Sequence, residues 1–187
     1  FINSTVKGNN ITIENAFSDA VDLDNSNIEF KNLRCSKIGN DCLDMSFSKG
    51  KLNTIKADYI NDKGVSLGEN SILELKEFNI NNAEIGVVSK DSSILKINYM
   101  QHNNVKLPIA AYIKKPEYGS PKLYVKNLIP TIDDNYLIGN DVKVVIDKKE
   151  LKSKIASSEV EKMLYGNLYG VKTKRRWDLR KNINFHP

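Results

Sequence analysis

The sequence predicts an all-β fold, a parallel β-helix of about five coils of ~22 residues with a short C-terminal helix as a cap. Three observations predict this fold. Windows of 22 residues stack with similar side chains aligned, apolar residues recur at fixed positions of successive windows, and no window before residue 150 keeps the period of an amphipathic helix. The expected strands have only about three to five residues between polar corners, and strands this short do not build a sandwich.

Four consecutive windows carry the repeat, and residues 1–23 supply one earlier coil. Each window begins with a turn rich in Ser or Asn and continues with a short alternation such as Ile28-x-Phe30. It then turns at a polar corner and ends in a second short strand such as Leu43-x-Met45. The windows are residues 25–46, 48–69, 70–91 and 92–113.

Equivalent positions of these windows form columns of similar side chains. A parallel β-helix needs such columns because the inward residues of each coil stack on those of the next coil, about 4.8 Å away. Stacked Asn side chains can hydrogen-bond along a column at a corner. The apolar columns are Val21, Leu43, Val65, Val87 and Leu23, Met45, Leu67; the small-residue column is Ala20, Cys42, Gly64, Gly86; the Asn column is Asn40, Asn61, Asn82.

The repeat loosens after Ile113, where Pro and Gly residues predict a loop over residues 114–121. We divide the chain into a β-helix over residues 1–130 and a C-terminal region of strands, capping helix and basic tail over residues 131–187. Within the later part, strands are expected at 122–125 and 142–146, and turns at 133–135 and 139–141.

A helix is expected over residues 159–165. Ser157 and Ser158 predict its N-cap, and Gly166 or Gly170 predicts its end. A helix at the open end of a β-helix would cover unpaired strand backbone. The residues expected to face the stack are Val160, Met163 and Leu164.

The chain has 187 residues and a formal net charge of +5, and the positive charge is concentrated near its end. Residues 151–187 hold 9 basic and 3 acidic residues. One short basic stretch is typical of a solvated terminus, so we expect no nucleic-acid partner. No apolar run approaches the roughly 20 residues of a membrane-spanning helix, so we expect no transmembrane segment. The residues around Phe1 already follow the strand-and-turn pattern, and we expect the chain to be a fragment of a longer protein.

Two cysteines, Cys35 and Cys42, fit neither a zinc-binding spacing nor a C-x-x-C redox motif. We interpret them as small apolar core residues. A disulfide between them stays open at this point. Sequence signatures of serine hydrolases, P-loop proteins, zinc proteases and dinucleotide-binding folds are absent from the chain.

Four motifs together resemble a known domain type. They are DAVDLD at residues 19–24, NDCLDMS at 40–46, NDKGVSLGE at 61–69 and GVVSKD at 86–91. The resemblance covers roughly residues 1–119 and is to the right-handed parallel β-helix domain found downstream of CotH-type, spore-coat kinase-like domains in bacterial envelope proteins. It implies a right-handed coil, a location in the bacterial cell envelope or outside the cell, and attachment to an N-terminal domain absent from this chain. The domain type implies no particular reaction.

Acidic side chains occupy one of the predicted columns. Asp22 and Asp44 share a repeat position and alternate with apolar neighbours, so both are expected to point outward about 5 Å apart. Ionising both carboxylates at that distance is costly unless a proton, a cation or a ligand intervenes. Further polar residues are expected on the same side: Asp19, Asp24, Asp41, Ser46, Asp62, Lys63, Ser66, Glu69, Lys90 and Asp91.

Three interpretations of this stripe compete. The preferred one is a binding or scaffold module whose polar stripe holds glycan, Ca²⁺ or another protein without chemistry, and a polysaccharide or glycan is the favoured ligand. The second is a polysaccharide-processing enzyme, either a glycoside hydrolase or a lyase or epimerase with Lys63 or Lys90 as base and Ca²⁺ neutralising a uronate. The third takes Asp, Asn and Ser simply as turn residues. The candidate catalytic residues are Asp22, Asp44 and Lys63; the candidate substrate-binding residues are Asp24, Asp41, Ser66, Glu69, Lys90 and Asp91; the candidate Ca²⁺ ligands are Asp22, Asp24 and Asp44.

Overall fold

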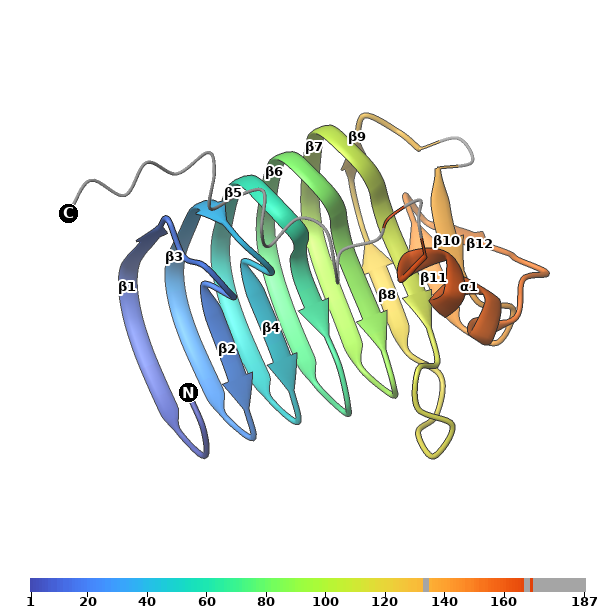
Figure 1. The fold of residues 1–187 in the computed structure, drawn as a ribbon, viewed down its shortest axis with the longest axis horizontal. Helices are drawn as coiled ribbons and strands as arrows, with labels where there is room; N and C mark the ends of the chain where they lie inside the picture. The colour runs from blue at the N-terminus through green and yellow to red at the C-terminus, as the bar shows by residue number, and fades with distance from the viewer. Residues whose placement is uncertain (133–134, 167–168, 170–187) are drawn as a thin grey trace.

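A computed structural model describes residues 1–132, 135–166 and 169 of the chain. It shows a parallel β-solenoid of about six turns at a spacing of ~22 residues, followed by one short helix (Figure 1). The predicted fold class is confirmed. The stack is one turn taller than expected because residues 122–138 pair with the fifth turn and complete a sixth.

The strands form one continuous sheet in the order β1-β3-β5-β6-β7-β8-β11-β12, with β2, β4, β9 and β10 pairing beside that path. All pairings are parallel except the one between β11 and β12. The elements are β1 Thr5–Glu14, β2 Val21–Asp24, β3 Asn27–Ile38, β4 Leu43–Ser46, β5 Lys49–Leu67, β6 Ile72–Lys90, β7 Ile94–Tyr112, β8 Lys122–Val125, β9 Leu128–Ile129, β10 Tyr136–Ile138, β11 Lys143–Ile146, β12 Lys149–Leu151 and α1 Ser157–Leu164.

The core fills the inside of the coil with the predicted columns. Val21, Leu43, Val65 and Val87 lie in direct register on successive rungs and are buried. The small-residue column has a steric cause at Gly86, where a Cβ would lie 2.4 Å from the carbonyl oxygen of Pro108. The apolar and small columns of the sequence are therefore confirmed.

Each turn of the coil bends at corners where one residue has a positive φ. Asn is common there because it tolerates the left-handed region better than most residues. Two such corners recur along the stack, at Asn3, Asn25, Phe47, Asn70, Ser92 and at Asn15, Lys37, Tyr59, Asn82, Asn104.

The predicted Asn column is wrong. The register between β5 and β6 shifts between Ile60 and Lys63, so Asn40 pairs with the backbone of Asp62, and Asn82 lies at the corner that Tyr59 occupies one rung earlier. The Asn ladders of the structure join other residues, Asn3 with Asn25, Asn10 with Asn32, and Asn82 with Asn104.

The two cysteines form a disulfide. Cys35 near the end of β3 is bonded to Cys42 just before β4, and both side chains are fully buried in the core. Their interpretation as core residues is confirmed, and the bond closes the corner that joins the two strands.

Strands β10, β11 and β12 and helix α1 lie at the last turn of the solenoid (Figure 1). Strands β8 and β11 and the turn at residues 139–141 occur where they were expected. The hairpin of β11 and β12 adds an antiparallel pair to the parallel stack. The expected turn at 133–135 falls partly, and Gly170 and the basic tail fall entirely, outside the described residues. No helix within the described ranges is long and apolar enough to cross a membrane.

Helix α1 follows the sheet as predicted, but its N-cap residue is not one of the predicted serines. Ala156, not Ser157 or Ser158, is the N-cap residue, and no side chain caps the helix. The Ser157 hydroxyl instead donates to Asp141 and accepts from the backbone of Ile113. The helix ends at Leu164, two residues before Gly166, in agreement with the predicted stop.

The helix packs against the outward side of the solenoid. Val160 and Leu164 are buried among outward-facing residues of β6, β7 and β10, including Val88, Ala110 and Leu137. Met163, which we expected to face the stack, is 38% exposed. The helix therefore covers the side of the later rungs, and no helix within residues 1–132 and 135–166 covers the same side of the earlier rungs.

Candidate functional site

The acidic column lies on that uncovered part of the solenoid side. Asp22 of β2 and Asp44 of β4 are direct partners in the parallel register, and Ser66 of β5 is the partner of Asp44 on the next rung. The column continues as Val88 and Ala110, which are buried beneath α1. The predicted placement of Asp22 and Asp44 on one face of adjacent rungs is confirmed.

The two carboxylates have different surroundings. Asp22 is exposed, and partial burial followed by the charges of Asp44 and Asp19 raises its pKa above the ordinary value. Asp44 is half-buried, and its Oδ1 accepts a hydrogen bond from the backbone of Met45 at 3.1 Å. Asp24 is the partner of Ser46 on the adjacent rung, two residues along the same strands. We call Asp22, Asp24, Asp44 and Ser46 the acidic face.

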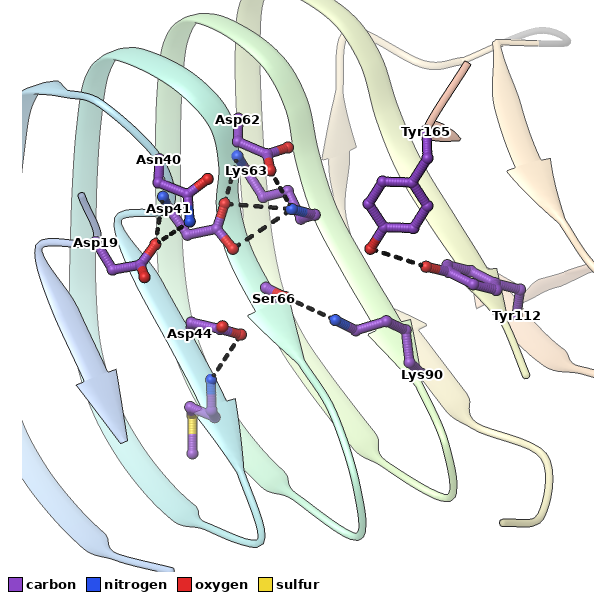
Figure 2. A network of polar contacts seen from close by, with 11 residues as sticks. Asp19, Asn40, Asp41, Asp44, Asp62, Lys63, Ser66, Lys90, Tyr112 and Tyr165 are labelled. Atoms are coloured by element: carbon purple, nitrogen blue, oxygen red, sulfur yellow. Dashed lines mark hydrogen bonds and ion pairs between the residues drawn. The ribbon is translucent and has the colours of Figure 1, made fainter. Parts of the chain in front are cut away.

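A second column beside the acidic face links three rungs through side chains (Figure 2). Asp19 Oδ1 accepts from Asn40 Nδ2 at 2.6 Å and from the backbone of Asp41 at 2.8 Å. Asp41 Oδ1 in turn accepts from the backbone of Lys63 at 3.0 Å. Each carboxylate thus receives the backbone N–H of the next rung, which is a structural use of an Asp at a corner.

Lys63 also ties this column together through its ammonium group. Its Nζ lies 3.4 Å and 3.5 Å from the two carboxylate oxygens of Asp41 and contacts Asp62 Oδ2. All three side chains are buried. Asp62 Oδ1 accepts no hydrogen bond from any described residue.

Burial and the neighbouring charges shift all three pKa values. Burial raises the pKa of Asp41 to about 8. The positive charge of Lys63 opposes part of this rise, and the negative charges of Asp62 and Asp44 add to it. Burial also raises the pKa of Asp62 against the opposing effect of Lys63. Burial alone would lower the pKa of Lys63, but Asp41 and Asp62 outweigh it and raise that pKa.

The remaining predicted residues lie between the acidic face and the helix. Lys90 Nζ donates to Ser66 Oγ at 3.1 Å, and both residues are buried. Glu69 is paired with Lys115, and although burial alone would raise the pKa of Glu69, its bonds to Lys115 and Ser46 lower it. Asp91 Oδ1 accepts from the backbones of Lys114 and Lys115 at 2.7 Å and 2.9 Å. Ser66 and Lys90 are thus joined, whereas Glu69 and Asp91 hold the loop after β7.

Two tyrosines, Tyr112 and Tyr165, lie on the helix side of the site. Tyr112 of β7 donates its hydroxyl to that of Tyr165, just after α1, at 3.4 Å (Figure 2). Burial followed by the neighbouring Tyr165 raises the pKa of Tyr112. Burial alone would raise the pKa of Tyr165, but nearby Lys90, Tyr112 and Lys63 lower it. The alternation of β7 predicts an outward Tyr112, whereas nothing in the local sequence pattern predicts its contact with Tyr165.

The expected Ca²⁺ ligands receive no support from the side-chain positions. Among the described residues, no three His, Cys, Asp or Glu side chains are grouped to hold a metal ion, and this includes the set of Asp22, Asp24 and Asp44.

Surface depressions occur elsewhere on the solenoid. Depressions of about 380 Å³ and 420 Å³ lie over outward side chains of β1, β3 and β5, lined by residues such as Lys7, Glu29 and Lys51. They share no residue with the acidic face.

In comparisons with known proteins, no protein-family model matches the chain, and neither a curated protein nor a solved structure matches it.

Proposed function

We propose that the chain is a carbohydrate-binding module of a bacterial surface or envelope protein and that it binds glycan along the acidic face. Ionised carboxylates accept hydrogen bonds and bind hydroxyl or ammonium donors strongly, and a neutral or amino sugar offers such donors. A polyanionic sugar would be repelled by Asp22, Asp24 and Asp44.

The observation that carries this proposal is the direct register of Asp22 and Asp44 on neighbouring rungs. The pair is held at the strand spacing of about 4.8 Å, so acceptors repeat regularly along the stack axis, as donors do along an extended glycan. Two other charged side chains of this side are engaged within the protein. Asp41 is bonded to Lys63, and Lys90 is bonded to Ser66.

The disulfide supports the proposed location. Disulfides form and persist mainly in oxidising compartments such as the bacterial periplasm and the cell surface. A bond between Cys35 and Cys42 in the core fits a protein that folds outside the cytoplasm. The resemblance to β-helix domains that follow CotH-type domains leads to the same location and to a preceding domain in the full protein.

A glycoside hydrolase is the second candidate. Retaining enzymes hold two carboxyl groups about 5 Å apart, and Asp22 and Asp44 lie on strands separated by about that distance. The raised pKa of Asp22 would suit the acid of such a pair. The lyase or epimerase alternative has less support, since Lys63 is buried and contacts two carboxyl groups.

A binding experiment with matched variants tests the proposal. Titration with labelled neutral, amino and uronate oligosaccharides should detect binding of the neutral or amino sugars. The double variant Asp22→Asn/Asp44→Asn should lower the affinity about a hundredfold or more, since each of the two lost charged hydrogen bonds contributes roughly 1.5–3 kcal/mol. Glu14→Gln, an exposed carboxylate of β1, is the control and should bind as the wild type does.

Two results would contradict the proposal. One is the absence of binding to every sugar class, and the other is an equal loss of affinity in the Glu14→Gln control. Release of reducing sugar by the wild type but not by Asp44→Asn would instead favour the hydrolase.

A further inference from the structure

The geometry points to a covalent cross-link between two rungs, an amide bond between Lys63 Nζ and Asp41 Cγ, formed with Asp62 as the proton acceptor. Figure 2 shows the amine lying between the two carboxyl groups. Nζ is nearly equidistant from both oxygens of Asp41, at 3.4 Å and 3.5 Å, and it also contacts Asp62 Oδ2. Asp41 precedes β4 and Lys63 belongs to β5, so the bond would join neighbouring rungs.

The cluster places ionisable groups where charge is costly. Exposure is 2% for Asp41, 3% for Asp62 and 7% for Lys63, and two carboxyl groups face one ammonium. Asp62 Oδ1 is buried and without a hydrogen-bond partner among the described residues. An uncompensated buried charge is expensive. Loss of water between Lys63 and protonated Asp41 removes the charge of the ammonium and leaves Asp62 with one proton as a neutral acid, so that no charge stays buried in the cluster.

The protonation states fit this reaction. Burial raises the pKa of Asp41 to about 8, so near neutral pH its carboxyl carries the proton that makes it an acylating group. The two carboxyl groups outweigh burial and raise the pKa of Lys63, so its amine is charged at rest. The reaction therefore begins with transfer of a proton from Nζ to Asp62, which is in direct contact with it.

The step balances without any further reactant. Neutral Nζ attacks Cγ of protonated Asp41, and a tetrahedral intermediate forms. Its Oδ1 keeps the hydrogen bond from the backbone N–H of Lys63, at 3.0 Å before reaction, which stabilises the developing negative charge. The C–Oδ2 bond then breaks, and the Oδ2 hydroxyl leaves as water with the second Nζ proton, relayed by Asp62. Asp62 retains the proton that it first received.

The fixed position of the two groups favours formation of the amide, and the exclusion of water protects it from hydrolysis. The folded rungs hold the amine against the carboxyl, and such proximity can replace a large part of the barrier of a bimolecular condensation. Outward apolar residues lie next to the cluster, since Ile85 is the register partner of Lys63 and is buried beside α1. Exclusion of water from this region disfavours hydrolysis of the bond.

Intact mass spectrometry of the denatured, reduced wild-type protein tests the cross-link. The expected mass is one water below the mass of the unmodified sequence. Because trypsin does not cleave after an acylated lysine, digestion should yield residues 38–49 joined to residues 57–76. An unmodified mass with separate peptides would overturn the inference, and this reading needs no variant.

Two variants separate the reaction from other losses of water. Lys63→Arg removes the nucleophile, and Asp62→Asn removes the proton acceptor while it keeps the side-chain shape; both should have the unmodified mass. Asp58→Asn, on the same strand β5, is the matched control and should keep the cross-link. Retention of the mass loss in Lys63→Arg would place the modification elsewhere and refute the assignment.

Discussion

At the scale of single residues, the acidic face is accessible at the surface, but repulsion between its carboxylates lowers the stability of the sheet. Asp22 and Asp44 are in register, and like charges directly opposite each other on neighbouring strands destabilise a sheet. Nearby, the half-buried Asp19 and the buried Asp41 each accept a backbone hydrogen bond, which offsets part of the cost of burying them. Among the described residues, the Asp22 carboxylate accepts no comparable hydrogen bond from the backbone of the next rung, so the cost of its charge is not offset in this way.

Asp22→Asn is expected to stabilise the protein at neutral pH. Burial, then Asp44 and Asp19, raises the pKa of Asp22 above its ordinary value of 3.8. A carboxyl with a raised pKa in the folded state favours folding only below its unfolded pKa, and this contribution is lost as pH rises through the folded pKa. The variant should therefore raise the free energy of unfolding at about pH 7 by less than about 1 kcal/mol, because the group is exposed.

Urea denaturation at two pH values checks this sign. Near pH 3, where Asp22 is protonated in both states, the variant should show no gain over the wild type. Glu14→Gln provides the comparison for a carboxylate away from the acidic face. A loss of stability in Asp22→Asn at both pH values would instead show that the carboxylate holds the fold.

At the scale of elements, helix α1 decides which rungs stay accessible. Its buried side chains cover outward apolar residues of the later rungs, and the acidic face lies on the earlier rungs, beyond the buried pair of Ser66 and Lys90. The helix has only eight residues, and short helices depend on tertiary packing for most of their stability. Its attachment should therefore depend on one or two anchoring side chains.

Leu164→Ala is expected to destabilise the protein by about 2–5 kcal/mol, the range for large buried side chains cut to Ala. Leu164 is 3% exposed in the outer apolar cluster, whereas its neighbour Met163 is 38% exposed. Met163→Ala on the same helix should therefore cost within about 0.5 kcal/mol, as for most surface changes. Thermal unfolding and hydrogen exchange of residues 157–164 measure both effects, and equal losses would show that the helix packs differently.

Repetition made the strands predictable, and its local interruption caused the errors. Val21, Leu43, Val65 and Val87 could be aligned because each position repeats the same physical demand on every rung. The Asn column failed because one register shift after Ile60 moves Asn82 to another corner, and a count of residues cannot place such a shift.

The candidate site was predictable only where it follows the repeat. The register pair of Asp22 and Asp44 comes directly from the columns. The contact of Tyr112 with Tyr165 was not predictable, because it depends on where a non-repeating helix settles on the solenoid side. The clustering of Lys63 with Asp62 and Asp41 depends on the side-chain directions at a bulge.

At the scale of the whole molecule, a solenoid is stabilised by contacts between neighbouring rungs. Its free energy of unfolding is approximately the sum of the intrinsic stabilities of the single rungs and the interaction energies between neighbouring rungs. An internal rung has two such interfaces, whereas the first turn has one. Side chains of the same type in one column should therefore contribute more to the free energy of unfolding on an internal rung than on the first turn.

One core column provides a matched test of this rule, because it contains isoleucine on the first and third rungs. Ile11, Leu33 and Ile55 are register partners, and the column continues as Phe78 and Met100. Ile55→Ala should lower the free energy of unfolding by about 2–5 kcal/mol, since its side chain is fully buried between two rungs. Ile11→Ala should cost less than half as much, because Ile11 is only half-buried on the first rung.

Hydrogen exchange should show the loss of protection spread over several rungs in Ile55→Ala and confined to residues 1–24 in Ile11→Ala. Equal losses in both variants, with the same exchange pattern, would mean that the stack unfolds as one unit and that nearest-neighbour terms do not govern its stability.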